Sequence, residues 1–251
     1  MKKLALLSAA LVLCTGLTAT ASMYDNFDSY ADKAAFDAVW TPSVGGGMLL
    51  ITDQPVPAAS PPNMIYQTTA ALQSRLAVAP VVAGDLYFKF DFYDERGTGS
   101  LARTYGMAYG RGGAGAWTDP LTQIIAVGKY NNVVTTKYSA RVAFGSSNWF
   151  TLDLGPDRTE GWHTAEVLGN LVTETYDFYI DGIFSGSAPM GNQGVVFNWA
   201  VMGSGLSSTH GMYFDNVYLG EKPVDPIPEP MSMMLAGLGL ATVGAIRRRR
   251  S

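Results

Sequence analysis

Hydrophobic and polar residues alternate along several short segments of this chain, most clearly over Leu86–Tyr93. Leu86 and the phenylalanines at 88, 90 and 92 fall on one face, and polar residues and tyrosines fall on the other. A period of two predicts a strand in a sheet that faces water on one side. The other segments that we predict as strands are Gln123–Val127, Tyr138–Phe144, Phe150–Leu154, Trp162–Leu168, Thr173–Ile180, Val195–Met202 and Met212–Leu219.

Turn sequences such as Gly155-Pro156-Asp157 and Gly169-Asn170 separate these segments. Many short strands without alternating helices predict an all-β, antiparallel sandwich. The exception is 32–40, where apolar residues follow helical spacing. We expect a short helix here that caps one open end of the sandwich, with Ser29 or Tyr30 leading in and Pro42 stopping it. The segment 52–63 carries four prolines, which predicts a loop.

The composition of the 251 residues narrows the class of protein. Hydrophobic residues make up 47% and charged residues 15%, which argues against disorder and allows one large β domain. The net charge is −4, and without residues 1–21 and 228–251 it becomes −9, from 11 basic and 20 acidic residues. This acidic balance suits divalent cations and excludes a basic nucleic-acid binder, and it is poorly suited to polyanions. The single cysteine, Cys14, precludes a disulfide within the chain.

The first 21 residues have the three parts of a secretory signal peptide. Lys2 and Lys3 precede an apolar run, and a small-x-small site ends at Ala21. We therefore predict cleavage between Ala21 and Ser22 by the secretion machinery. Leu13 is too bulky to precede a lipoprotein cysteine at position 14.

The C-terminal end divides into three parts. Residues 221–230 form a proline-rich spacer, residues 231–246 are uncharged and mostly apolar, and residues 247–251 are a basic tail. A helix of sixteen residues is about 24 Å long and reaches across a bilayer of about 30 Å when arginines snorkel and the lipid thins. The alternative is a core helix, which the four terminal arginines disfavour. We therefore expect a transmembrane helix before processing, with both chain ends in the cytoplasm.

The triplet Pro228-Glu229-Pro230, followed by the apolar segment and Arg247, Arg248, Arg249 and Arg250, resembles the PEP-CTERM sorting signal. The resemblance implies an exosortase-like processing partner and a Gram-negative bacterium. It also implies passage through an inner-membrane intermediate to the cell surface or the exopolysaccharide matrix. It covers only about residues 227–251 and implies no activity for residues 22–220, which we take as the folded domain.

A second resemblance lies within that domain. Trp162-His163-Thr164, leading to Tyr179-Ile180-Asp181-Gly182, is similar to the hairpin of laminin-G-like and concanavalin A-type jelly rolls. The Asp-Gly pair suits a tight two-residue turn. The segment 213–217 resembles the closing strand of these sandwiches, and 24–28 resembles it in composition, as expected if the first and last strands are neighbours. The implied fold is a jelly-roll-type sandwich.

Asp25, Asp28 and Asp215 would converge if the first and last strands pair. Their carboxylates, with backbone carbonyls, suit Ca²⁺, and jelly rolls of this kind often carry a structural calcium. The alternative is that these aspartates cap turns and face solvent.

Tyr105, Tyr109, Arg111 and Trp117 lie in or beside the glycine-rich stretch 106–115. A flexible backbone with exposed aromatics would stack against the apolar faces of sugar rings, which makes these residues a candidate glycan site. The alternative is that Trp117 and one tyrosine fill the core beneath a mobile loop. The stretch has no phosphate-loop ending.

No catalytic pattern stands out. The two histidines, His163 and His210, have no partner at metal-ligand spacing, and neither a nucleophile elbow nor a Glu-x-Asp-x-x-Glu strand occurs. The sequence therefore favours an exported, non-enzymatic surface or matrix protein with a structural or glycan-binding role. The alternatives are a polysaccharide-degrading hydrolase or lyase on a jelly roll, and a protein-binding adhesin.

Overall fold

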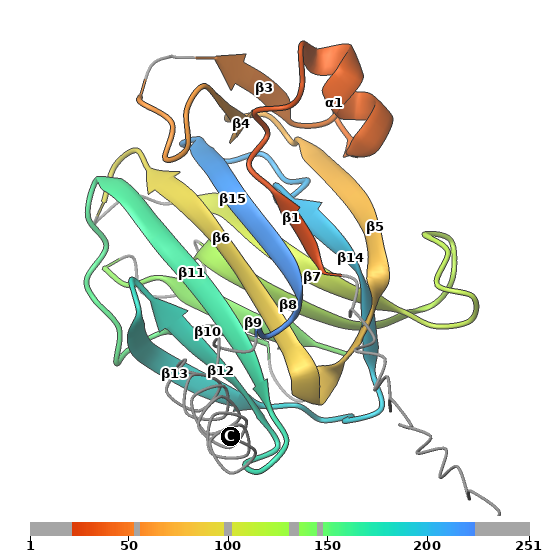
Figure 1. Ribbon diagram of the computed structural model, residues 1–251. Coiled ribbons are helices and arrows are strands. Elements are labelled where there is room, and N and C mark those ends of the chain that lie inside the picture. Colours follow the sequence, from red (N-terminus) through yellow and green to blue (C-terminus); the bar gives the residue numbers. More distant parts are fainter. Residues whose placement is uncertain (1–21, 53–55, 98–101, 131–135, 145–147, 224–251) are drawn as a thin grey trace, which may run out of the picture. The chain divides into compact units, whose positions relative to one another are not determined.

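The computed structural model describes residues 22–52, 56–97, 102–130, 136–144 and 148–223. Within this part the chain folds into two antiparallel sheets packed face to face, with one short helix (Figure 1). The expectation of an all-β, jelly-roll-type sandwich is confirmed. The predicted signal peptide, the Pro-Glu-Pro triplet, the apolar segment 231–246 and the basic tail lie outside the described residues. No helix among the described residues has the length and apolarity needed to span a membrane.

We call the first sheet sheet A. Its strands follow the order β13-β12-β11-β6-β15-β4-β3, and β1 pairs with β15. Their bounds are β1 Met23–Asp25, β3 Leu49–Thr52, β4 Asn63–Gln67, β6 Leu86–Asp94, β11 Gly161–Asn170, β12 Thr175–Ile180, β13 Ile183–Pro189 and β15 Met212–Glu221.

We call the second sheet sheet B. Its strands follow the order β10-β9-β8-β7-β14-β5-β2. Their bounds are β2 Thr41–Val44, β5 Gln73–Val82, β7 Arg103–Arg111, β8 Leu121–Tyr130, β9 Ser139–Ala143, β10 Trp149–Thr151 and β14 Val196–Met202. A 3-10 turn, η1 (Ala83–Asp85), joins β5 of this sheet to β6 of sheet A.

The hydrophobic core lies between the two sheets. From sheet A, β6 contributes Phe88, Phe90 and Phe92, which are fully buried as the alternation predicts. From sheet B, Val127 and Phe197 belong to the same apolar cluster. Each sheet therefore turns one side toward the core and the other side outward.

The helix α1 spans Lys33–Val39 and lies at one end of the sandwich (Figure 1). It buries Phe36, whose ring packs against Phe27 and Trp40. The N-cap is Asp32, whose carboxylate accepts from the backbone N–H of Ala35, so the expected lead-in at Ser29 or Tyr30 is corrected. Aspartate is favoured at this position because its oxygen satisfies a backbone donor of the first turn.

All eight predicted strands are present, and the first and last strands are neighbours, with Tyr24 opposite Tyr218. Asp181 and Gly182 form the predicted tight turn between β12 and β13, both with positive φ, as a two-residue hairpin turn requires. The loop after Thr52 contains no helix or strand over residues 56–62.

The sequence missed β2, β3, β4, β5, β7 and β13. The most consequential of these is β7, because the glycine-rich stretch predicted to be flexible is a regular strand as far as Arg111. A Cβ on Gly106 would lie 2.8 Å from the ring of Phe90, so the glycine makes room for the opposite sheet. Its absence of a side chain reflects packing, not flexibility.

Candidate functional site

Alternation along β7 sorts its side chains between the core and the outer side of sheet B. Gly106 and Ala108 face the core, whereas Tyr105 and Met107 belong to a second apolar cluster that is separate from it. We call the outer side of sheet B the aromatic face. Its rings are Tyr105, Tyr109, Trp117, Tyr130, Trp149 and Trp199.

The rings form two groups of contacts. Tyr109 and Trp117 stack with nearly parallel planes and centroids 5.5 Å apart, and Trp199 packs edge-on against Trp117 at 5.3 Å. Tyr130 and Trp149 stack at 4.3 Å and 6°, and Tyr105 lies 4.7 Å from Trp149. Most of these rings are half-buried, so the face keeps an accessible apolar surface.

Arginines lie against the same rings. The guanidinium carbon of Arg75 is 4.2 Å from the ring centroid of Trp117, and that of Arg111 is 4.3 Å from it. These are short cation–π distances. Burial lowers the pKa of Arg75, and the nearby positive charge of Arg111 lowers it further.

The loop 112–120 between β7 and β8 carries Trp117 and is held in place by hydrogen bonds. The indole N–H of Trp199 donates to the carbonyl of Gly115 at 2.8 Å. The side chain of Asn198 accepts from the backbone N–H of Arg111 and donates to its carbonyl. A cavity of about 300 Å³ lies beside this loop, lined in part by Arg111, Asn192 and Asn198. The loop therefore holds Trp117 in a defined position, and its residues 112–115 line the small cavity.

The structure brings together all four residues of the predicted glycan site. Tyr109, Arg111 and Trp117 contact one another, and Tyr105 lies on the same face beside Trp149. Sequence reasoning missed the residues that other strands contribute: Arg75, Tyr130, Arg141, Trp149 and Trp199. Alternation in the predicted strand 195–202 could have indicated Trp199. Arg75 comes from the unpredicted strand β5 and gave no such signal.

Of the three aspartates of the predicted calcium site, Asp28 and Asp215 lie at the same loop segment, whereas Asp25 is hydrogen-bonded elsewhere. Asp28 and Asp215 both bind the segment 60–63, where they accept from the backbone N–H of Asn63 and Ser60. Asp25 accepts from Phe27 N, the Tyr30 hydroxyl and the Trp40 indole on the helix side.

Both oxygens of Asp215 accept backbone N–H groups, of Ser60 and Asn216. Burial, followed by the negative charges of Asp28 and Asp91, raises the pKa of Asp215 to about 7, although these hydrogen bonds act in the opposite direction. Among the described residues, no group of three or more histidine, cysteine, aspartate or glutamate side chains could hold a metal ion. Protein donors thus use the oxygens that calcium would need here, and calcium binding stays a prediction.

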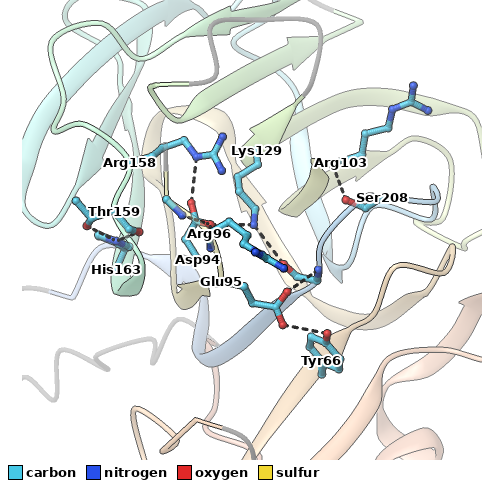
Figure 2. Close-up of polar contacts among 12 residues, drawn as sticks. Tyr66, Asp94, Glu95, Arg96, Arg103, Lys129, Arg158, Thr159, His163 and Ser208 are labelled. Atoms are coloured by element: carbon cyan, nitrogen blue, oxygen red, sulfur yellow. Dashed lines mark hydrogen bonds and ion pairs between the residues drawn. The ribbon is translucent and has the colours of Figure 1, made fainter. Parts of the chain in front are cut away.

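A buried ionic cluster lies between the two sheets. Asp94 accepts from Lys129 Nζ at 3.1 Å and from Arg158 Nε at 3.0 Å, and all three side chains are buried (Figure 2). Burial raises the pKa of Asp94, but the two cations lower it more, and the net shift is downward. Because β6 and β8 belong to different sheets, this cluster joins the sheets.

A second cavity, of about 430 Å³, lies beside Tyr93 and Tyr213 and is lined by Glu95, Arg96 and Glu160. Glu95 accepts from the Tyr66 hydroxyl at 3.0 Å (Figure 2) and from the backbone N–H of Gly211 at 2.8 Å. Two carboxylates and two aromatic rings thus line the same cavity.

Comparison with known proteins identifies one motif and one fold. The PEP-CTERM protein-sorting motif matches residues 226–250, and no curated protein matches the chain. A sialidase superposes with a TM-score of 0.51 at 8% identity, over 81% of this chain and 19% of its own, so this chain spans about a fifth of its length. The apo Crh5 transglycosylase gives 0.48 at 11% identity over 80% and 84%. A β-glucanase of Bacillus licheniformis gives 0.43 at 13% identity over 81% and 99%.

The likeness to the sialidase supports the sandwich fold alone. The motif implies export, processing by an exosortase-type enzyme and sorting to the cell surface. The chain is therefore a jelly-roll-type β-sandwich protein that ends in a PEP-CTERM sorting motif.

Proposed function

We propose that this protein is a non-enzymatic component of the cell surface or exopolysaccharide matrix, and that it binds glycan chains through the aromatic face. The sorting motif accounts for delivery to the surface. The role after delivery is supported by the sandwich, which displays six aromatic rings on the outer side of one sheet.

The observation that carries this proposal is the pairing of aromatic rings with polar donors on an outward surface. Tyr109, Trp117 and Trp199 form an apolar surface, and the guanidinium groups of Arg75 and Arg111 lie against it. Sugar rings have apolar C–H faces and hydroxyl edges, so they need both kinds of group.

Replacement of Trp117 by alanine tests the site. Trp117 is the centre of the contacts of Tyr109, Arg75 and Arg111, so Trp117→Ala should weaken glycan binding about tenfold or more. Binding of the purified protein to a glycan array, followed by titration with the best ligand, measures the change.

The matched control is Trp162→Ala on sheet A, where the tryptophan packs against Tyr93 away from the aromatic face. Equal loss in both variants, or unchanged binding in Trp117→Ala, would refute the proposed site.

A polysaccharide-degrading enzyme is the alternative, and the cavity with Glu95 and Glu160 is the observation that favours it. Glycoside hydrolysis uses two carboxylates on either side of the scissile bond. Release of reducing ends from an exopolysaccharide panel, abolished by Glu160→Gln, would support the enzyme over the binding protein.

A further inference from the structure

The charged residues of the sandwich are divided between the two sheets. The strands of sheet B contain four arginines and one lysine and no aspartate or glutamate. The strands of sheet A contain seven acidic residues and a single lysine, Lys89. The lysine of sheet B, Lys129, points inward to Asp94, so the charges on the outer side of this sheet are the arginines. These are Arg75, Arg103, Arg111 and Arg141.

The arginines lie close to one another around the rings. Arg75 and Arg111 both lie over Trp117, and the positive charge of Arg111 is close enough to lower the pKa of Arg75 further below the value that burial gives it. Arg141 lies opposite Trp149 of β10 and opposite Ala126 of β8, and both of these residues belong to the outer apolar cluster of sheet B. The aromatic face is therefore a cluster of like charges.

Arg75, Arg111 and Arg141 form no ion pair with a carboxylate within the described part of the chain. The guanidinium groups of Arg75 and Arg141 make no hydrogen bond or ion pair there, and their Nε atoms are buried without an acceptor. The rings of Trp117 and Trp199 lie against the guanidinium of Arg75 instead. A guanidinium that stacks by its face keeps its in-plane N–H donors for an acceptor outside the protein, and a carboxylate matches that geometry with two hydrogen bonds.

Resting on the proposed function, we propose that the aromatic face binds a polysaccharide whose sugars carry carboxylate groups. Each such sugar offers the two features that the face lacks: apolar C–H surface for the rings and an anion for the arginines. The acidic net charge of the chain argues against a polyanion as ligand only if the charge is spread evenly. Its acids lie in the strands of the other sheet and in the loops, so the face itself is positive.

A pair of polymers that differ in charge alone tests this inference. The probes are sodium polygalacturonate and its methyl-esterified form, which keep the same sugar rings. The purified protein should bind the acid at least tenfold more tightly than the ester, because esterification removes the anion. Added salt should weaken binding of the acid and leave binding of the ester unchanged, because salt screens exposed charges.

Variants test whether the preference for the acidic polymer arises at the aromatic face. Arg75→Gln and Arg141→Gln should each lower affinity for polygalacturonate about tenfold or more, since each removes a charged hydrogen-bond donor for the carboxylate. The controls are the single variants Lys89→Gln and Lys137→Gln. Each removes one positive charge, as each arginine variant does, but from an ion pair away from the aromatic face, and should leave affinity unchanged. Circular dichroism and melting show whether each variant folds, and the polymer comparison needs no variant.

Three outcomes would overturn the inference. Equal binding of acid and ester, lost in Trp117→Ala, would remove the anionic ligand and leave the glycan-binding function intact. Binding of single-stranded DNA as tight as that of polygalacturonate would show a general polyanion face, since aromatic and basic surfaces also bind nucleic acid strands. Failure to bind either polymer or any glycan on the array would remove the proposed function as well.

Discussion

The imidazole of His163 lies between two oxygen acceptors near the start of β11. Its Nδ1 is 2.8 Å from Asp181 Oδ2, and its Nε2 is 3.0 Å from the carbonyl oxygen of Thr159. Burial lowers the pKa of His163, but the contacts with Asp181 and Thr159 raise it, and the net shift is upward from 6.5. Burial raises the pKa of Asp181, whereas the hydrogen bonds from His163 and Thr164 lower it below 3.8. The charged pair is thus the favoured state in the folded protein.

These shifts predict a pH window for the contribution of the pair to stability. The histidine contribution is complete below its unfolded pKa of about 6.5 and is lost as pH rises through the raised folded value. The aspartate contribution is present above an unfolded pKa of about 3.9 and is lost as pH falls through the lowered folded value. Asp181→Asn should therefore destabilise the protein most between about pH 4 and 6.5, by about 1 kcal/mol, a low value because Asp181 is 39% exposed.

Asparagine suits this test because it tolerates the positive φ of 53° at position 181. Urea unfolding of both proteins at pH 5.5 and pH 8 gives the difference directly, and His210 titrates alike in both. A penalty that is larger at pH 8 than at pH 5.5 would contradict the assignment of a charged pair.

At the scale of the elements, the cluster of Asp94, Lys129 and Arg158 connects strands of opposite sheets. Asp94 ends β6, Lys129 lies near the end of β8, and Arg158 lies in the loop before β11. The backbone N–H groups of Arg96 and Gly97 also donate to Asp94. One carboxylate therefore anchors a loop and two cations in a place where none of the three side chains has appreciable contact with water.

Substitutions of different members of this cluster should lower the free energy of unfolding by very different amounts. Asp94→Asn leaves two buried cations without their carboxylate and should lower the free energy of unfolding by about 3–5 kcal/mol. Lys129→Met removes one buried charge, keeps an unbranched side chain, and leaves Asp94 bonded to Arg158, so its cost should be clearly smaller. Urea denaturation at neutral pH compares the two variants. Equal losses would show that packing, and not the charge of Asp94, determines stability here.

Periodicity predicted the strands whose two faces differ sharply, such as β6 with its buried phenylalanines. It failed where small residues occupy the inner face. In β7 the inner positions include Gly106 and Gly110. Without large apolar residues at these positions, Tyr105 and Tyr109 do not stand out as one face of a strand. That pattern depends on Phe90 and Met202 from other strands, which fill the space above Gly106. These two residues are distant in the sequence, so a local pattern cannot show why glycine is needed at position 106.

The same limit applies to the candidate site. The stretch of sequence around Trp117 was enough to predict a glycan site with aromatic rings and to name four of the residues of the aromatic face. Arg75 and Trp199 come from strands more than thirty residues away from Trp117 along the chain. Only the pairing of β14 with β5 and β7 brings them together. Composition also concealed the site, because an average charge cannot show that acids and arginines occupy different sheets.

At the scale of the whole molecule, the predicted signal peptide and the sorting motif define two processing steps, one at each end of the sandwich. The PEP-CTERM motif covers residues 226–250 and begins just after the sandwich, whose last strand ends at Glu221. Processing in this region would therefore release the sandwich without cutting a strand. The aromatic face belongs wholly to residues before the motif, so the mature protein would keep it.

Mass spectrometry of the protein from separate cell fractions tests this scheme. We expect the surface form to begin at Ser22 and to lack the four terminal arginines, and a membrane form to retain them. Replacing Arg247–Arg250 with glutamine should shift the protein toward the unprocessed form, because we expect these arginines to fix the orientation of the tail for processing. The matched control is Lys89→Gln with Lys137→Gln, which changes charge within the sandwich and should leave processing unaltered. Recovery of intact Met1–Ser251 from the cytosol of the unaltered strain would refute export, and with it the surface role of the aromatic face.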